Sequence, residues 1–204
     1  HKHMQETTHL MDQAYQLLKA KGMIRPRDLK AAAIPESHLW EMASEGRIQH
    51  LGRGLYALNE LELSSFHSLV EVALYVPKGV ICLLSALQYH ELTTQLPPAV
   101  WLAIPAHAHR PQIPHLTLEL VQIKPDLLTL GIETHVLEGT PVRIFSSART
   151  IADCFKFRGR VGMDVALEAL KMGLEKGVKA DEIWSFSKQL RVSKVILPYL
   201  EALA

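Results

Sequence analysis

Apolar residues recur at helical spacing in three stretches of the first 45 residues, which predicts three short helices at residues 8–21, 25–32 and 36–45. Gly22 and Gly46 end the first and the third helix, and Pro26 suits the first turn of the second. The second and third helices are separated by only a few residues around Ala33-Ile-Pro.

After Gly46 the pattern changes to two short strands, at residues 47–51 and 55–58. Gly52-Arg53-Gly54 lies between them and predicts a tight glycine-rich turn. Three helices, of which the last two are joined by a tight turn, followed by a hairpin are typical of a winged helix-turn-helix. We therefore expect such a domain over residues 4–60.

The remaining chain mixes both kinds of element. Glu60-Leu-Glu-Leu-Ser is the expected seam between two domains, and helices are predicted at residues 65–75 and 80–90. Strands are predicted at residues 100–104, 116–123, 131–137 and 142–145, and closing helices at residues 147–157, 162–174, 181–190 and 194–203. Strands in the middle with helices at both ends favour an α+β fold for residues 61–204. Residues 1–3 are interpreted as the remnant of an expression tag.

Charge supports nucleic-acid binding only locally, because the formal net charge of all 204 residues is +1. Between Lys19 and Leu58 there are seven basic residues and four acids, which leaves a local surplus of three positive charges. The basic residues are Lys19, Lys21, Arg25, Arg27, Lys30, Arg47 and Arg53, and the acids are Asp28, Glu36, Glu41 and Glu45. A DNA duplex attracts proteins mainly through its phosphates, so this clustering favours DNA binding.

The positions of these residues suggest their roles. Arg25, Arg27 and Lys30 lie at or near the start of the second helix, which in this motif usually contacts the DNA backbone. Arg53 lies at the tip of the expected wing, between two glycines.

The third helix is expected to enter the major groove. Its apolar side chains face inward, so Ser37, Trp40, Glu41 and Ser44 face outward. His38 and His50 add positive charge on contact with phosphate. Trp40 suits packing as well as a base contact, and winged helices also serve as protein-interaction modules.

Several segments of the sequence resemble the AbiEi-type antitoxins and transcriptional regulators of type IV toxin–antitoxin systems. In the N-terminal part these are Ala33-Ile-Pro-Glu-Ser-His-Leu-Trp, Glu45-Gly-Arg-Ile and Gly52-Arg-Gly-Leu-Tyr-Ala-Leu. Further on they are Pro77-Lys-Gly-Val-Ile-Cys-Leu-Leu-Ser-Ala-Leu, Leu96-Pro-Pro-Ala-Val-Trp-Leu-Ala-Ile-Pro, Asp164-Val-Ala-Leu-Glu-Ala-Leu and, most specifically, Phe145-Ser-Ser-Ala-Arg-Thr-Ile-Ala-Asp-Cys-Phe-Lys-Phe-Arg. The resemblance spans about residues 4–174.

The resemblance implies two roles. The winged helix would bind inverted repeats in its own operon's promoter and repress transcription, with Arg47 and Arg53 in the wing. The C-terminal domain would counter a toxin of the nucleotidyltransferase type, with or without direct contact, and would help to assemble the repressor on DNA. The family is not enzymatic, so the resemblance implies no catalytic residue.

Other candidate chemistry is weaker. His107, His109 and His115 invite a metal site, but neighbouring prolines predict a loop and no acid or cysteine is near in sequence, so we expect no metal or cofactor. Cys82 and Cys154 form neither a disulfide framework nor a zinc pattern. Cys154 follows Asp153, but no base is found at a useful spacing, and a core position fits it better than a nucleophile.

Arg149, Asp153, Lys156 and Arg158 have helical spacing, which favours intrahelical pairing in a solvated group. The alternative is a basic surface formed by Lys156, Arg158 and Arg160, which lack nearby acids in sequence.

The sequence shows no signal peptide and no apolar run long enough for a membrane span, so we expect a cytoplasmic protein. The favoured function is a DNA-binding repressor and antitoxin. The alternatives are a nucleic-acid-modifying enzyme and a protein-interaction module, each using the winged helix for targeting.

Overall fold

The structure is a computed structural model that describes residues 2–204. Its chain divides into two compact units, residues 1–71 with 135–141 and residues 72–134 with 142–204. The division falls inside one helix, α4 (Glu60–Tyr75), and not at its start. Residues 60–64, where the boundary between the two domains was expected, form the first part of this helix. The expected boundary between residues 60 and 61 stays a prediction.

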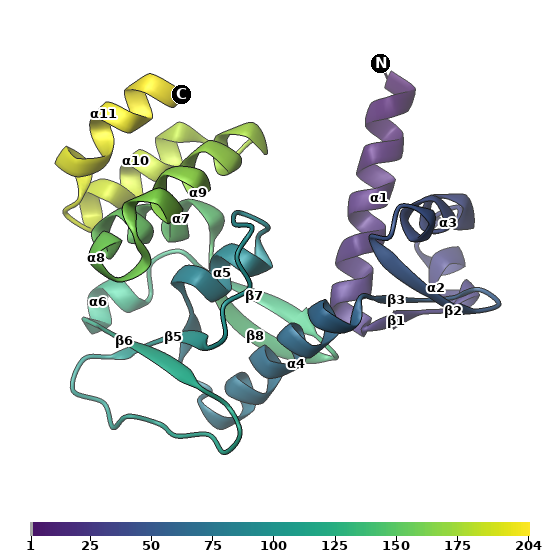
Figure 1. The fold of residues 1–204 in the computed structure, drawn as a ribbon, viewed down its shortest axis with the longest axis horizontal. Coiled ribbons are helices and arrows are strands. Elements are labelled where there is room, and N and C mark those ends of the chain that lie inside the picture. Colours follow the sequence, from purple (N-terminus) through teal and green to yellow (C-terminus); the bar gives the residue numbers. More distant parts are fainter. Residues whose placement is uncertain (1) are drawn as a thin grey trace. The chain divides into compact units, whose positions relative to one another are not determined.

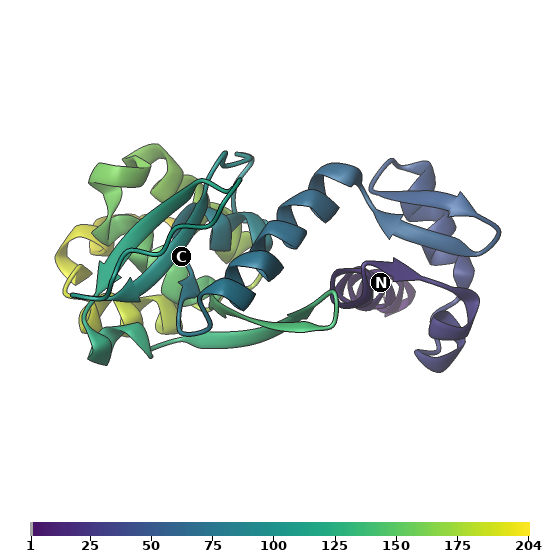
Figure 2. The same ribbon diagram turned by 90° about the horizontal axis from the view of Figure 1, so that it is seen from below.

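The first unit contains a winged helix-turn-helix, as the sequence predicts (Figure 1). Its elements are α1 (Lys2–Lys21), β1 (Met23–Ile24), α2 (Pro26–Ala31), α3 (Glu36–Ser44), β2 (Ile48–Gly52) and β3 (Leu55–Leu58). The three strands form an antiparallel sheet in the order β1-β3-β2, and the β2–β3 hairpin forms the wing (Figure 2). Strand β1 was not predicted, because two residues are too few to show alternation.

The core of this unit joins α1 and α3 to the sheet. Ala14, Leu18, Leu39 and Met42 are completely buried, and so is Tyr56 from β3. The helix expected from Thr8 begins at Lys2, so residues 2 and 3 of the expected tag belong to α1, while residue 1 lies outside the described residues.

The second unit is built on a mixed five-stranded sheet with the strand order β6-β5-β4-β8-β7. Its strands are β4 (Val80–Ile81), β5 (Val100–Pro105), β6 (Leu118–Ile123), β7 (Ile132–Leu137) and β8 (Thr140–Phe145). β5 pairs with β6, and β4 with β8, in parallel, whereas β4 and β5 are antiparallel. The tip of the β7–β8 hairpin, residues 135–141, is grouped with the first unit.

Helices supply the rest of the second unit's core. They are α5 (Leu83–Tyr89), α6 (Pro125–Leu128), α7 (Ser147–Lys156), α8 (Arg158–Val161), α9 (Met163–Glu175), α10 (Ala180–Gln189) and α11 (Ser193–Leu203). α7 packs against α5, α9 and α10, and Ile151, Cys154 and Phe155 on it are fully buried. Together with the strands these helices confirm the α+β fold class.

One predicted element was wrong. The helix expected over residues 80–90 is a two-residue strand, β4, followed by α5, with Cys82 in extended conformation between them. A short apolar run does not distinguish a buried strand from a buried helix, and this explains the error. Among the described residues, no helix combines the length and hydropathy needed to span a bilayer.

An ion pair holds the hairpin tip within the first unit. His67 of α4 lies 2.8 Å from Glu138 through Nδ1 and 3.1 Å from Glu71 through Nε2. The hydrogen bond to Glu138 is the main cause that raises the pKa of His67, and the negative charge of Glu138 raises it further. The backbone N–H of Gly139 also donates to the Ala20 carbonyl, at 3.2 Å.

We predict that this contact weakens as the pH rises. Because the pKa of folded His67 is raised, its stabilising contribution is complete below the unfolded pKa of about 6.5 and is lost as the pH rises through the folded value. An NMR titration of the imidazole measures this pKa, and Glu138→Gln should move it back toward 6.5. An unchanged pKa in that variant would contradict the assignment.

Candidate nucleic-acid interface

A buried tyrosine joins the wing to the start of α3. The Tyr56 hydroxyl donates to Glu36 Oε1 at 3.1 Å, and its ring stacks on His50 with centroids 4.6 Å apart. Burial, followed by the hydrogen bond to Glu36, raises the pKa of Tyr56 to about 12, so the hydroxyl keeps its proton. His50, which was expected to add positive charge on contact with phosphate, is exposed and stacks on this core side chain.

A carboxylate organises the start of α2. Asp28 accepts the backbone N–H of Arg25 at 2.9 Å and pairs with Lys21 Nζ at 2.8 Å. The hydrogen bond from Lys21 is the largest cause of the lowered pKa of Asp28. This arrangement fixes the backbone from which Arg25 and Arg27 extend.

Two of the seven basic residues counted in the sequence interact with other side chains of this unit, Lys19 in the core and Lys21 in an ion pair at the surface. Lys19 is 4% exposed and lies over the rings of Tyr15 and Phe66, and Lys21 is paired with Asp28. The other five are all exposed, and they are Arg25, Arg27, Lys30, Arg47 and Arg53. The count of charges along the sequence therefore included basic residues with different surroundings, and the structure shows which of them are exposed on α2 and around the wing.

The outward face of α3 carries the residues expected there. Ser37, Glu41 and Ser44 are exposed and His38 is half-buried. The Ser44 hydroxyl donates to the Glu41 carbonyl at 2.7 Å, so its hydrogen is used within the helix. Trp40 is 64% exposed, which argues against a packing role for it within this unit.

Two contacts fix the wing. The Asn59 side-chain amide donates to the carbonyls of Gly46 and Arg47, at 3.3 and 3.2 Å, and holds the chain where it enters β2. At the tip, Gly54 has a φ of +70°, and a Cβ there would lie 2.5 Å from Cγ of Pro26. The wing therefore packs directly on the first residue of α2, and Arg53 is adjacent to that contact.

Residues 12–59 match the family described as "Transcriptional regulator, AbiEi antitoxin". The match covers α1 from Asp12 through the wing to Asn59, and so identifies an AbiEi-type domain. The family resemblance found in the sequence is confirmed over this segment. Comparison with curated proteins gives no match.

The second unit corrects two expectations about charge. Arg149 and Asp153 pair as predicted, with Nε donating to Oδ2 at 3.0 Å, but both are fully buried and not solvated. Arg160 was expected to lack an acid, yet its Nη2 lies 3.1 Å from Glu119 Oε2. The acid was missed because it lies 41 residues away in the sequence.

The cysteines and histidines have structural surroundings. Cys82 and Cys154 are buried free thiols, and burial raises the pKa of Cys154, so a protonated core thiol fits better than a nucleophile. His107, His109 and His115 lie in the loop between β5 and β6, as the prolines predicted.

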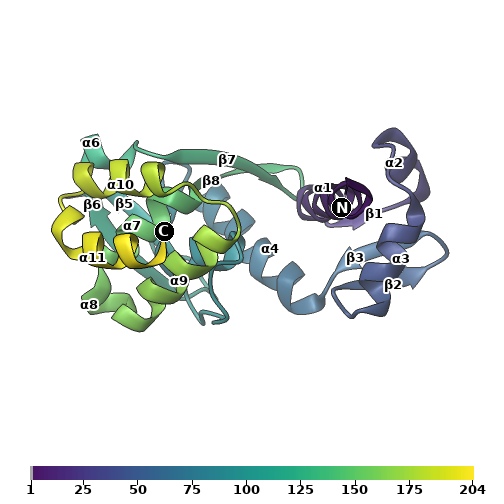
Figure 3. The ribbon, with the colours of Figure 1, turned by 90° about the horizontal axis from the view of Figure 1, so that it is seen from above.

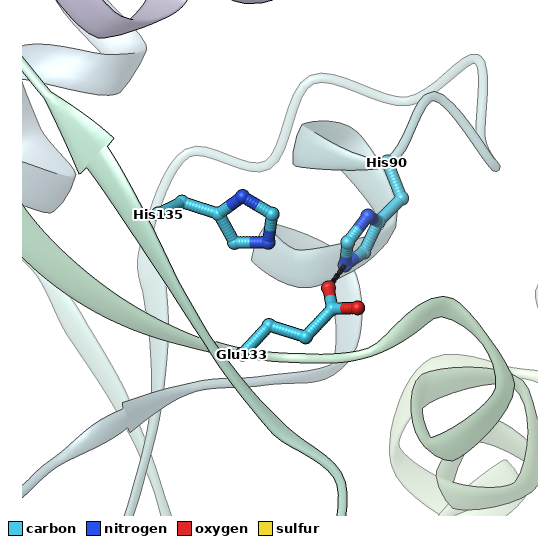
Figure 4. Close-up of side chains that lie close together, drawn as sticks. All are labelled: His90, Glu133 and His135. Carbon is cyan, nitrogen blue, oxygen red and sulfur yellow. Dashed lines mark ion pairs between the residues drawn. The ribbon is translucent and has the colours of Figure 1, made fainter.

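One further histidine pairs with an acid. His90 Nε2 lies 3.9 Å from Glu133 Oε1 (Figure 4) and 2.8 Å from the Phe145 carbonyl. A carbonyl oxygen only accepts hydrogen bonds, so His90 Nε2 carries a proton. This nitrogen therefore has no lone pair available to bind a metal ion.

We predict that Gly54→Ala destabilises the first unit by about 1–3 kcal/mol, because alanine at a positive φ is strained and its Cβ would overlap Pro26. Gly52→Ala is the matched control in the same hairpin, since a Cβ at Gly52 meets no atom within 4 Å. Chemical denaturation measures the free energy of unfolding of both variants. Equal midpoints for the two variants would show that the wing does not depend on the contact between Gly54 and Pro26.

Proposed function

We propose that this protein is a DNA-binding transcriptional repressor, and that it acts as the antitoxin of a type IV toxin–antitoxin system. The observation that carries the proposal is the exposure of all five remaining basic residues on α2 and around the wing. In a winged helix-turn-helix these elements contact the DNA backbone on either side of the recognition helix. The match to a family of regulators and antitoxins supports the same function.

Each candidate residue has a role in this proposal. Arg25, Arg27 and Lys30 bind phosphates from α2, and Arg47 and Arg53 do so from the wing. Ser37, His38, Glu41 and Ser44 of α3 face base edges in the major groove, where serine hydroxyls and acids read sequence.

The operator follows from symmetry. Two copies on an inverted repeat place two α3 helices in successive major grooves, which is why repressors with this motif bind palindromic sites. We propose such sites in the promoter of the protein's own operon.

A regulator of this kind acts where the chromosome is, which in a bacterial cell is the cytoplasm.

The same face also has one feature that favours protein binding. Trp40 is exposed on α3 beside Glu41, and exposed tryptophans are enriched at the centres of protein interfaces. DNA titration separates the two functions, because a protein-binding module shows no steep salt dependence with DNA.

We predict that the full-length protein binds duplex DNA from upstream of its own gene, and that affinity falls steeply between 50 and 200 mM salt. Arg27→Ala and Arg53→Ala should each reduce the magnitude of the salt slope by about one, since each removes one phosphate contact. Fluorescence anisotropy measures the slopes. Lys171→Ala, an exposed lysine on α9, is the control and should leave the slope unchanged. No binding at low salt would refute the repressor.

The antitoxin role is tested separately. When the protein is co-expressed with the nucleotidyltransferase-type toxin of its operon, the double variant Arg27→Ala/Arg53→Ala should lose repression of a promoter reporter and still restore growth. We expect this because the proposal assigns toxin neutralisation to the part of the chain after the winged helix. Loss of both activities in a variant that remains folded and abundant would contradict that separation.

A further inference from the structure

The second unit contains a cavity of about 650 Å³ beside the C-terminal part of α7. Its walls come from the end of β6, from α6, from α7 and from the turn between α10 and α11. Figure 3 shows α6, α7, α10 and α11 gathered at one end of this unit. The volume lies within the usual range for small-molecule sites, about 300–1,000 Å³. We call this space the α7 cavity.

The walls of the α7 cavity are strongly basic. Five lysine and arginine residues line it against two aspartates, which leaves a surplus of three positive charges. The basic residues are Lys124, Arg149, Lys156, Arg158 and Arg191, and the acids are Asp126 and Asp153. Burial lowers the pKa of Lys156, the negative charge of Asp153 opposes this, and the charges of Arg149, Lys124 and Arg191 lower it further. These cations are thus close enough to repel one another, and an anion would relieve that repulsion.

A buried arginine in the wall has hydrogen-bonding capacity left over. Arg149 is fully buried. Its Nε donates to Asp153 at 3.0 Å, and its Nη1 donates to the carbonyls of Leu127 and Leu130 at 2.5 and 2.8 Å. Within residues 2–204, Nη2 of Arg149 and Oδ1 of Asp153 have no hydrogen-bond partner. The guanidinium also lies over the Phe145 ring, 4.1 Å from its centroid, so Arg149 adds fixed positive charge behind the cavity wall without itself being exposed to a ligand.

The remaining lining suits an organic group. Phe157 offers an aromatic ring, and Leu190, Val192 and Val195 are apolar. Gln122 and Gln189 also line the cavity, and a glutamine amide both donates and accepts hydrogen bonds. An aromatic ring with amide groups nearby is the surrounding that a nucleobase prefers, because a base stacks on its faces and hydrogen-bonds along its edge.

We propose that the α7 cavity binds a mononucleotide, with its phosphate at Lys156 and Arg191, which are exposed on its wall, and its base beside Phe157. The site lies wholly in the second unit and is independent of DNA binding by α2 and the wing. A partly open cavity of this volume accommodates one nucleotide and not a duplex, which favours a small molecule over duplex DNA.

The test is calorimetry on the full-length protein with AMP, adenosine and inorganic phosphate as probes. AMP should bind more tightly than inorganic phosphate by at least tenfold, and adenosine should bind at least tenfold more weakly than AMP. Lys156→Gln and Arg191→Gln should each weaken AMP binding by about tenfold. Both side chains are exposed, so these variants should fold, whereas removing Arg149 would leave Asp153 buried and unpaired.

Two controls locate the site. Lys171→Gln lies outside the cavity, and Arg27→Ala/Arg53→Ala alters only the winged helix, so both should leave AMP binding unchanged. The proposal is overturned if AMP shows no binding at millimolar concentration, or if adenosine binds as well as AMP. It is also overturned if Lys156→Gln affects DNA binding alone, which would assign the cavity's charge to nucleic acid.

Discussion

The proposed DNA-binding surface depends on the burial of Tyr56. This side chain comes from the wing, and its hydroxyl is bonded to Glu36 at the start of α3. A hydrogen bond of this kind contributes about 0.5–1.5 kcal/mol net, and the buried ring contributes more. The two elements that must meet DNA together are therefore fixed to one another. The close packing of Gly54 on Pro26 then joins α2 to the same frame.

Much of this fold could be predicted from the sequence, because its signals are local. Pro26, Gly46 and the pair of glycines around Arg53 mark where the helices and the hairpin of the first unit begin and end. The elements that were missed or wrong, such as β1, β4 and the full length of α1, are short or have no apolar periodicity. Their conformation is set by partners distant in the chain, as when Met23 pairs with Ala57.

The candidate site was predictable in part for the same reason. The five exposed basic residues were all named from position along the chain, but charge counting also included Lys19, whose burial depends on packing beside Phe66. In the second unit the spacing of Arg149 and Asp153 indicated a pair and gave no sign of its burial. The carbonyls of Leu127 and Leu130 accept hydrogen bonds from the Arg149 guanidinium and so make its burial possible. They are 22 and 19 residues away in the sequence and lie beside Arg149 only in the folded chain.

The most direct test of the DNA-binding account is amide hydrogen exchange on the full-length protein, with and without duplex DNA from upstream of its gene. Bound DNA should slow exchange in α2, in α3 and in residues 47–55, because these segments form the proposed contact surface. Bound DNA that leaves these three segments unchanged and protects another part of the chain would contradict it.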